Sequence, residues 1–136
     1  MSDREEVSRW MSRAHNDIIV ARHSFDDLCP KQLEICCYLC QQAAEKALKA
    51  FLLFKEYEFP WTHDLVKLCQ LCMDFDNGFD GLLNDCSDLT PYATQARYPN
   101  KIEIEETETA AALSKAEKLV GMVTGLICPA EESISQ

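Results

Sequence analysis

The strongest constraint on the fold is a helical period of apolar residues along two long stretches of the chain. Between residues 31 and 55 this period gathers the apolar side chains on one helical face: Leu33, Cys36, Cys37, Cys40, Ala44, Ala47, Leu48, Phe51 and Phe54. Residues 3–25 show the same period. Pro30 separates the two stretches, because proline disfavours helix at the residue before it. The sequence therefore predicts two long helices, at residues 3–25 and 31–55.

Local signals predict two further helices in the middle of the chain. Thr62 can cap the third helix, with Asp64 favourable in its first turn, and the pair at residues 77–78 ends it. The fourth helix is predicted over residues 79–96, with an irregularity near Pro91.

The last helix is predicted over residues 107–127, after a turn at residues 97–100 and an extended or irregular segment at residues 102–106. Because short connections make neighbouring helices antiparallel, the expected fold is all-α: a five-helix up-and-down antiparallel bundle with two long N-terminal helices. We expect residues 1–128 to form a single helical domain and residues 129–136 to be a frayed tail.

Charge and composition exclude several classes of function. The chain has 23 acidic and 13 basic residues, a net charge of −10, which disfavours non-specific nucleic-acid binding but leaves a local basic pocket open. No apolar run reaches membrane-spanning length, and the charged N-terminal segment lacks the apolar core of a signal peptide. A glycine-rich phosphate loop is also missing. We therefore expect a cytoplasmic protein that does not bind membranes.

The eight cysteines include two CxxC pairs, Cys37 with Cys40 and Cys69 with Cys72. Four thiolates can hold zinc, and in a chain without an export signal reduced thiols are expected. On antiparallel helices, however, the two pairs would lie about 10 Å or more apart at a rise of about 1.5 Å per residue, too far for a shared zinc ion. The sequence therefore predicts core packing of these thiols and no metal or other cofactor, with zinc binding and redox chemistry as the alternatives.

A polar strip runs along the second predicted helix. Gln42, Glu45, Lys46 and Lys49 recur at steps of three or four, and Glu45 with Lys49 is an i,i+4 pair in the favourable order. The strip is either a solvated face with ion pairs, or a face directed at a groove or a subunit partner.

Two other polar features are candidates for a ligand site. His63, next to Asp64 at the start of the third helix, either fixes the turn by a local hydrogen bond or lines a pocket. Arg97, followed by Tyr98, either satisfies helix carbonyls at a helix end or binds a phosphate or carboxylate.

Three segments taken together resemble the HEPN domain family. They are QQAAEKALKA at residues 41–50, THDL at residues 62–65 and ARYP at residues 96–99. Residues of the first helix are similar to the family as well: Trp10, Ala14, Asp17 and Ala21. The resemblance extends from about residue 5 to residue 127, and the combination is far more specific than any single piece.

The resemblance implies a five-helix bundle that is usually a homodimer. Many prokaryotic HEPN proteins are encoded beside a minimal nucleotidyltransferase and act with it as a two-component or toxin–antitoxin pair. Some members bind nucleotides, and others are metal-independent RNases that use an Arg-x(4–6)-His motif at the dimer interface.

The chain departs from this RNase motif. The three permitted histidine positions after Arg97 hold Ile102, Glu103 and Ile104, none of which replaces an imidazole. Arg9 and His15 match the spacing by count, but they lie in the first helix rather than at the family's position. The departure argues against enzymatic activity of the usual kind.

We therefore expect a nucleotide- or anion-binding homodimer with a small nucleotidyltransferase as partner. Its predicted ligand-binding residues are Lys46, Lys49, His63, Asp64, Arg97 and Tyr98. One alternative is an RNase in which Arg97 positions the phosphate and His63 transfers protons, so that RNA is the substrate. The other is a dimeric scaffold that binds no ligand.

Overall fold

The computed structural model describes residues 4–95 and 103–128, and every element in these ranges is helical. In chain order the elements are α1 (Arg4–Asp26), α2 (Leu33–Phe54), α3 (Leu65–Met73), the 3₁₀-helix η1 (Asn77–Leu82), α4 (Leu83–Leu89), α5 (Tyr92–Gln95) and α6 (Glu106–Ile127). The all-α prediction is confirmed, and the ends of the three long helices lie within two residues of the predicted ones.

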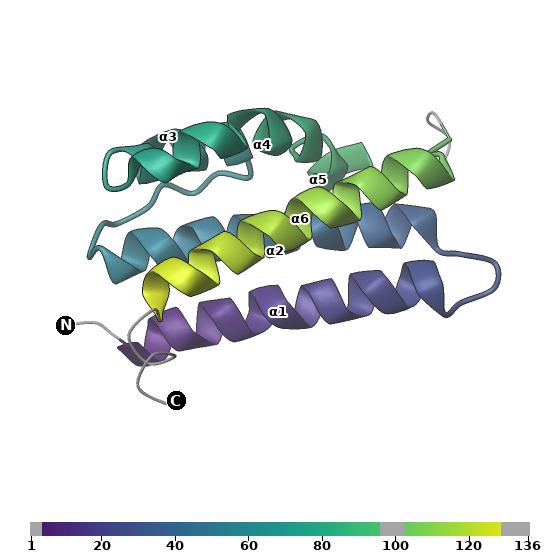
Figure 1. Ribbon diagram of the computed structural model, residues 1–136, viewed down its shortest axis with the longest axis horizontal. Helices are drawn as coiled ribbons and strands as arrows, with labels where there is room; N and C mark the ends of the chain where they lie inside the picture. The colour runs from purple at the N-terminus through teal and green to yellow at the C-terminus, as the bar shows by residue number, and fades with distance from the viewer. Residues whose placement is uncertain (1–3, 96–102, 129–136) are drawn as a thin grey trace.

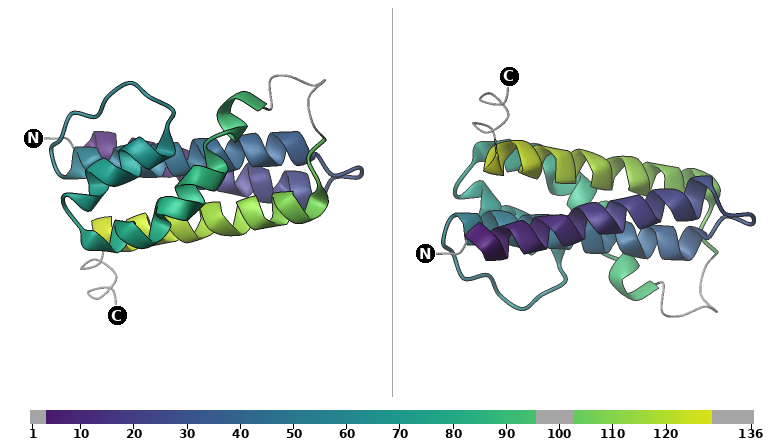
Figure 2. Two further views of the ribbon diagram at one scale, coloured as in Figure 1. Left: turned by 90° about the horizontal axis from the view of Figure 1, so that it is seen from above. Right: turned by 90° about the horizontal axis from the view of Figure 1, so that it is seen from below.

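Helix α2 lies at the centre of the bundle. Helices α1, α2 and α6 run along the long axis of the molecule, and the short elements α3, η1, α4 and α5 follow one another on the side of α2 away from α1 (Figures 1 and 2). Helix α2 contacts all five other α-helices. This central position explains why so much of α2 is buried, including polar residues that a surface helix would leave in water.

Small side chains on α2 allow its neighbours to approach closely. Four alanines of α2 are fully buried: Ala43, Ala44, Ala47 and Ala50. Six cysteines are fully buried as well: Cys36, Cys37, Cys40, Cys69, Cys72 and Cys86. The predicted core packing of both CxxC pairs is therefore confirmed.

Burial holds the Cys37 thiol in its protonated form. Cys37 donates a hydrogen bond to the hydroxyl of Thr109 at 3.5 Å, and Cys69 donates to the carbonyl of Phe79 at 3.3 Å. Burial raises the pKa of Cys37 to about 11, although its hydrogen bond with Thr109 opposes the increase. Among the described residues, no three His, Cys, Asp or Glu side chains are grouped as a possible metal site.

The start of α3 differs from the prediction. Asp64, not Thr62, is the N-cap residue, because its carboxylate accepts the free backbone N–H groups of Val66 at 3.0 Å and Lys67 at 3.4 Å. The Thr62 hydroxyl forms a turn one step earlier by accepting from the N–H of Asp64 at 3.1 Å. His63 therefore precedes the helix instead of lying in its first turn.

The segment between α3 and α6 is more divided than predicted. Helix α3 ends at Met73, and residues 77–78 begin η1 rather than ending α3, because the Asp76 side chain accepts from the N–H of Gly78 at 2.8 Å. Instead of one helix over residues 79–96 there are η1, α4 and α5, with the break between α4 and α5 at Pro91, which has no N–H to donate. The described residues thus form six α-helices rather than five.

Some sequence predictions lie outside the described residues: the turn at 97–100, Ile102 and the tail at 129–136. The next three residues, 103–105, are non-helical as predicted. None of the helices in the described ranges is long and apolar enough to span a membrane.

Candidate functional site

The polar strip of α2 is buried only in part: Glu45 and Lys49 are buried, whereas Gln42 and Lys46 are half-buried. Gln41, Glu45 and Lys49 follow one another at four-residue intervals and are only 0%, 6% and 3% exposed. They are covered by Trp10 of α1 and by the loop of residues 55–64 between α2 and α3, which brings Phe59, Trp61 and His63 onto them. We call this segment the α2–α3 loop.

Glu45 is the centre of a hydrogen-bonded group that we call the Glu45 network: Gln41, Glu45, Lys49 and His63. The Glu45 carboxylate accepts from Lys49 Nζ at 2.8 Å, from Gln41 Nε2 at 3.0 Å and from His63 Nδ1 at 3.0 Å. Gln41 Nε2 also donates to the backbone carbonyl of His63 at 3.2 Å, which fixes the loop to α2. Two elements of the chain, α2 and the α2–α3 loop, thus meet at one carboxylate.

The network holds Glu45 in its ionised form. Burial opposes ionisation, but the hydrogen bonds from Lys49, Gln41 and His63 and the charge of Lys49 outweigh it, so the pKa of Glu45 is lowered. An ionised carboxylate can only accept hydrogen bonds, so the proton in the hydrogen bond between His63 and Glu45 is carried by His63 Nδ1. Nε2, on the other edge of the ring, is left for water or a ligand, and the His63 side chain is 68% exposed.

Three aromatic rings surround the Lys49 ammonium. Its Nζ lies 5.2 Å from the ring centre of Phe59, 5.8 Å from that of Trp61 and 5.9 Å from that of Trp10. Trp10 and Phe59 also pack edge to face, with their centres 5.7 Å apart. Trp61 is 92% exposed, although it is one of the largest apolar side chains of the protein. An exposed indole next to an exposed imidazole is a surface on which a flat polar ligand can stack.

The other predicted ligand residues have different surroundings. Lys46 Nζ pairs with Asp17 Oδ2 of α1 at 2.6 Å, so its charge is balanced within the protein. Asp64 uses its carboxylate as the cap of α3. Arg97 and Tyr98 lie outside the described residues. The structure therefore brings together Lys49 and His63, through Glu45, and leaves Lys46 and Asp64 in other ion pairs or hydrogen bonds.

Trp61 is the site residue that sequence reasoning missed. It lies in the irregular α2–α3 loop, next to Pro60, where no helical period singles it out. Its position directly before Thr62 and His63 was the available signal.

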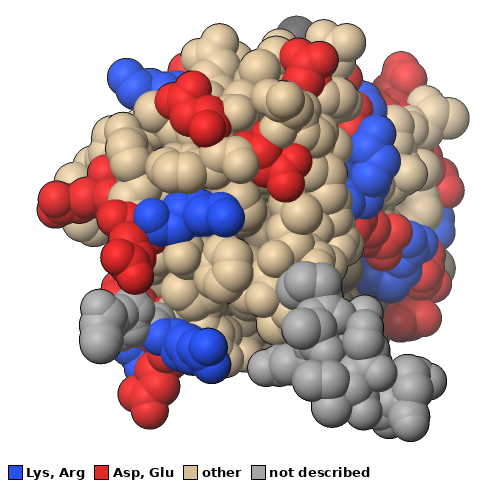
Figure 3. Space-filling view, turned by 60° about the vertical axis from the view of Figure 1, so that its left-hand side comes forward, with Lys and Arg blue, Asp and Glu red and all other residues tan. Residues whose placement is uncertain are grey.

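The surface gives little general attraction for anions. Figure 3 shows the molecule with the end at which α2 finishes turned forward, and both acidic and basic side chains lie around a largely uncharged centre. With a net charge of −10, an anionic ligand has to be held by a few local groups rather than by the field of the whole protein.

The comparisons with known proteins agree with the fold. The crystal structure of ST0689, an archaeal HEPN homologue, is 26% identical, with a TM-score of 0.70 over 89% of this chain and 97% of that chain. The crystal structure of TT1696 from Thermus thermophilus is 24% identical, with a TM-score of 0.69 over 87% of this chain and 95% of that chain, and shows the same fold. Among curated proteins, none has a significantly similar sequence. The model of the HEPN domain matches residues 7–126, and the chain therefore belongs to the HEPN domain family.

Proposed function

We propose that this protein is a nucleotide-binding HEPN module that acts as a homodimer together with a minimal nucleotidyltransferase. The observation that carries the proposal is the pair of exposed rings on the α2–α3 loop, Trp61 and His63, with His63 held in place by Glu45. The dimer and the partner are expectations that come from membership of the family.

Each group of the site has a role that matches a part of a nucleotide. The Trp61 indole offers a face for a base, and stacking of one base on an aromatic ring contributes about 1–3 kcal/mol. His63 Nε2 is directed away from Glu45 and can donate to a phosphate or a ribose hydroxyl when the ring carries a second proton. Lys49 is buried against Glu45, so it fixes the two rings rather than contacting the ligand. Arg97 and Tyr98 are proposed to complete the site.

A thermal-shift screen against purine and pyrimidine nucleotides tests the proposal. A nucleotide at 100 times its Kd adds about 2.7 kcal/mol of stability, which is a shift of several degrees for a domain of this size. Trp61→Ala and His63→Ala should each abolish the shift. His23→Ala is a matched control, because His23 Nδ1 forms the same kind of pair with Asp27 at 3.0 Å on the surface of α1. The proposal is wrong if no nucleotide shifts the melting temperature, or if the control loses the shift as well.

Light scattering tests the proposed dimer, and co-purification with a co-expressed minimal nucleotidyltransferase tests the proposed partner. A monomer at micromolar concentration would contradict the first expectation. Failure of the two proteins to elute together would contradict the second.

The His63–Glu45 pair favours metal-independent RNA cleavage as a second candidate function. A histidine oriented by a carboxylate is the usual arrangement of a proton-transferring group, and the two atoms are 3.0 Å apart. In this reading His63 transfers the proton and Arg97 positions the phosphate. RNA cleavage that is lost in His63→Ala and kept in His23→Ala would support this function. Nucleotide binding without cleavage would leave the binding module as the function.

A further inference from the structure

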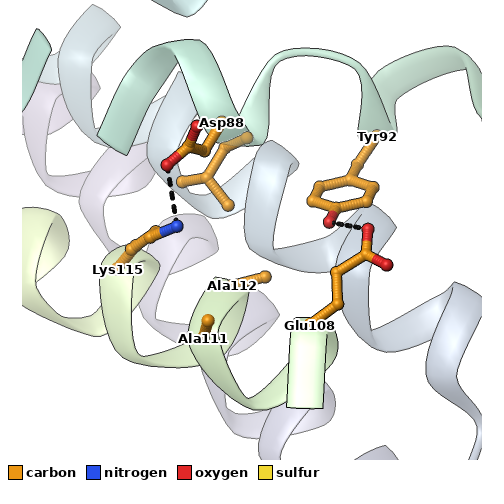
Figure 4. Close-up of a pocket in the computed structure, with 7 residues that line it drawn as sticks. Asp88, Tyr92, Glu108, Ala111, Ala112 and Lys115 are labelled. Atoms are coloured by element: carbon orange, nitrogen blue, oxygen red, sulfur yellow. Dashed lines mark hydrogen bonds and ion pairs between the residues drawn. The ribbon is translucent and has the colours of Figure 1, made fainter. Parts of the chain in front are cut away.

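A hollow lies away from the Glu45 network, between α4, α5 and α6. It has a volume of about 380 Å³, within the range of small-molecule sites. Its floor is apolar, formed by the buried Leu89 of α4 and Ala112 of α6, with Ala111 at the rim (Figure 4). The hollow exists because α6 presents only methyl groups at these two alanine positions.

Two polar pairs close the ends of this hollow (Figure 4). At one end Lys115 Nζ contacts Asp88 Oδ2 at 2.8 Å, so these two charges balance. At the other end the hydroxyl of Tyr92 donates to the carboxylate of Glu108. Tyr92 remains neutral, because burial and its hydrogen bond to Glu108 raise its pKa well above the ordinary value. Among the residues that the structure describes, Asp88 and Lys115 balance each other, whereas Glu108 forms no ion pair with a cation.

We propose that this hollow binds a small organic amine, whose ammonium group contacts Glu108 and whose hydrocarbon body covers Leu89 and Ala112. An anionic ligand is disfavoured because two carboxylates face one lysine. A neutral ligand would desolvate the Glu108 carboxylate without supplying a counter-charge. The site shares no residue with the nucleotide site proposed above, so either proposal can be wrong without affecting the other.

Methyl NMR with labelled alanine and leucine tests the proposal with three probes of equal length: pentylamine, pentanol and pentanoate. Pentylamine should shift the signals of Ala111, Ala112 and Leu89. Pentanol and pentanoate should bind at least about tenfold more weakly, as expected when a hydrogen bond to a charged group is lost. The proposal is overturned if pentanol or pentanoate binds as tightly as the amine, or if the shifts occur at methyl groups outside the hollow.

Three variants separate the charge from the shape of the hollow. Glu108→Gln removes the charge and keeps the hydrogen-bonding shape, including the capping box with Glu105, so it should weaken pentylamine about tenfold. Ala111→Leu should block binding by filling the hollow. Glu58→Gln removes the same charge from the α2–α3 loop and should change nothing. Unchanged affinity in Glu108→Gln would overturn the proposal.

Discussion

The buried ion pair of the Glu45 network makes the most demanding prediction. The side chains of Lys49 and Glu45 are only 4% and 8% exposed, and their charged atoms are 2.8 Å apart. Glu45→Gln keeps the shape of the side chain but leaves the Lys49 ammonium buried without a counter-charge. Breaking one side of a buried pair costs about 3–5 kcal/mol. The three aromatic rings around Nζ offset part of this cost, since a desolvated cation–π contact contributes about 2 kcal/mol.

We therefore expect Glu45→Gln to lower the free energy of unfolding by about 3 kcal/mol, which corresponds to a fall in Tm of about 10 °C. Lys49→Met should cost less, because Glu45 keeps its hydrogen bonds from Gln41 and His63. The double variant has no unpaired charge, so its cost should be smaller than the sum of the single costs by about 1–3 kcal/mol. Urea unfolding of the four proteins at pH 7 measures all of these terms.

The half-buried pair of Asp17 and Lys46 provides the matched control. It joins α1 to α2, and its side chains are 16% and 23% exposed, so solvent weakens the cost of breaking it. The equivalent cycle with Asp17→Asn and Lys46→Met should give a coupling of about 1 kcal/mol or less. Equal couplings at the two sites, or a coupling at Glu45 below about 0.5 kcal/mol, would refute the reasoning that burial makes the Glu45 network unusual.

Three further predictions concern stability. Asp64→Ala should cost about 1 kcal/mol in urea unfolding, because the N–H groups of Val66 and Lys67 lose their acceptor; an unchanged midpoint would show that water replaces the cap. Glu56→Gly should raise stability by about 0.5 kcal/mol, because Glu56 has a φ of 60°, a left-handed conformation that favours glycine; a loss of stability would contradict this. Folding lowers the pKa of Glu45, so the contribution of its charge to the free energy of unfolding is complete above the unfolded pKa of about 4.3 and disappears as the pH falls through the folded pKa. The difference in unfolding free energy between wild type and Glu45→Gln should therefore narrow between about pH 6 and pH 3. A constant difference would contradict the assignment of Glu45 as ionised.

The long helices could be predicted because their sequence pattern directly reports burial. The apolar period of α1, α2 and α6 is repeated over many turns, so local irregularities do not hide it. The segment between Met73 and Glu106 has no such repetition. Its boundaries depend on single side chains such as Asp76, which accepts from a backbone N–H, and Pro91, which lacks one. Such local contacts compete closely, and a single sequence does not show which of them prevails.

The candidate site could be predicted only in part. The spacing of Glu45 and Lys49 predicted their ion pair, because residues four apart face each other on any helix. Their burial was not predictable, because the cover comes from Trp10, Phe59 and His63, which lie far along the chain from α2 or in an irregular loop. Whether a helix face is buried depends on the segments that pack on it. When the buried residues are charged, the apolar period of the helix sequence does not reveal their burial.

The same network separates a structural role of His63 from a binding role. His63→Ala removes one hydrogen bond from Glu45, which keeps its bonds from Lys49 and Gln41, and the exposed ring is replaced by water. This variant should therefore cost about 1 kcal/mol, much less than Glu45→Gln. Both variants should lose nucleotide binding, because Glu45→Gln leaves the imidazole less firmly oriented. If His63→Ala destabilises the protein as much as Glu45→Gln does, His63 is mainly a cover for the buried charges, and the proposed nucleotide site loses its principal support.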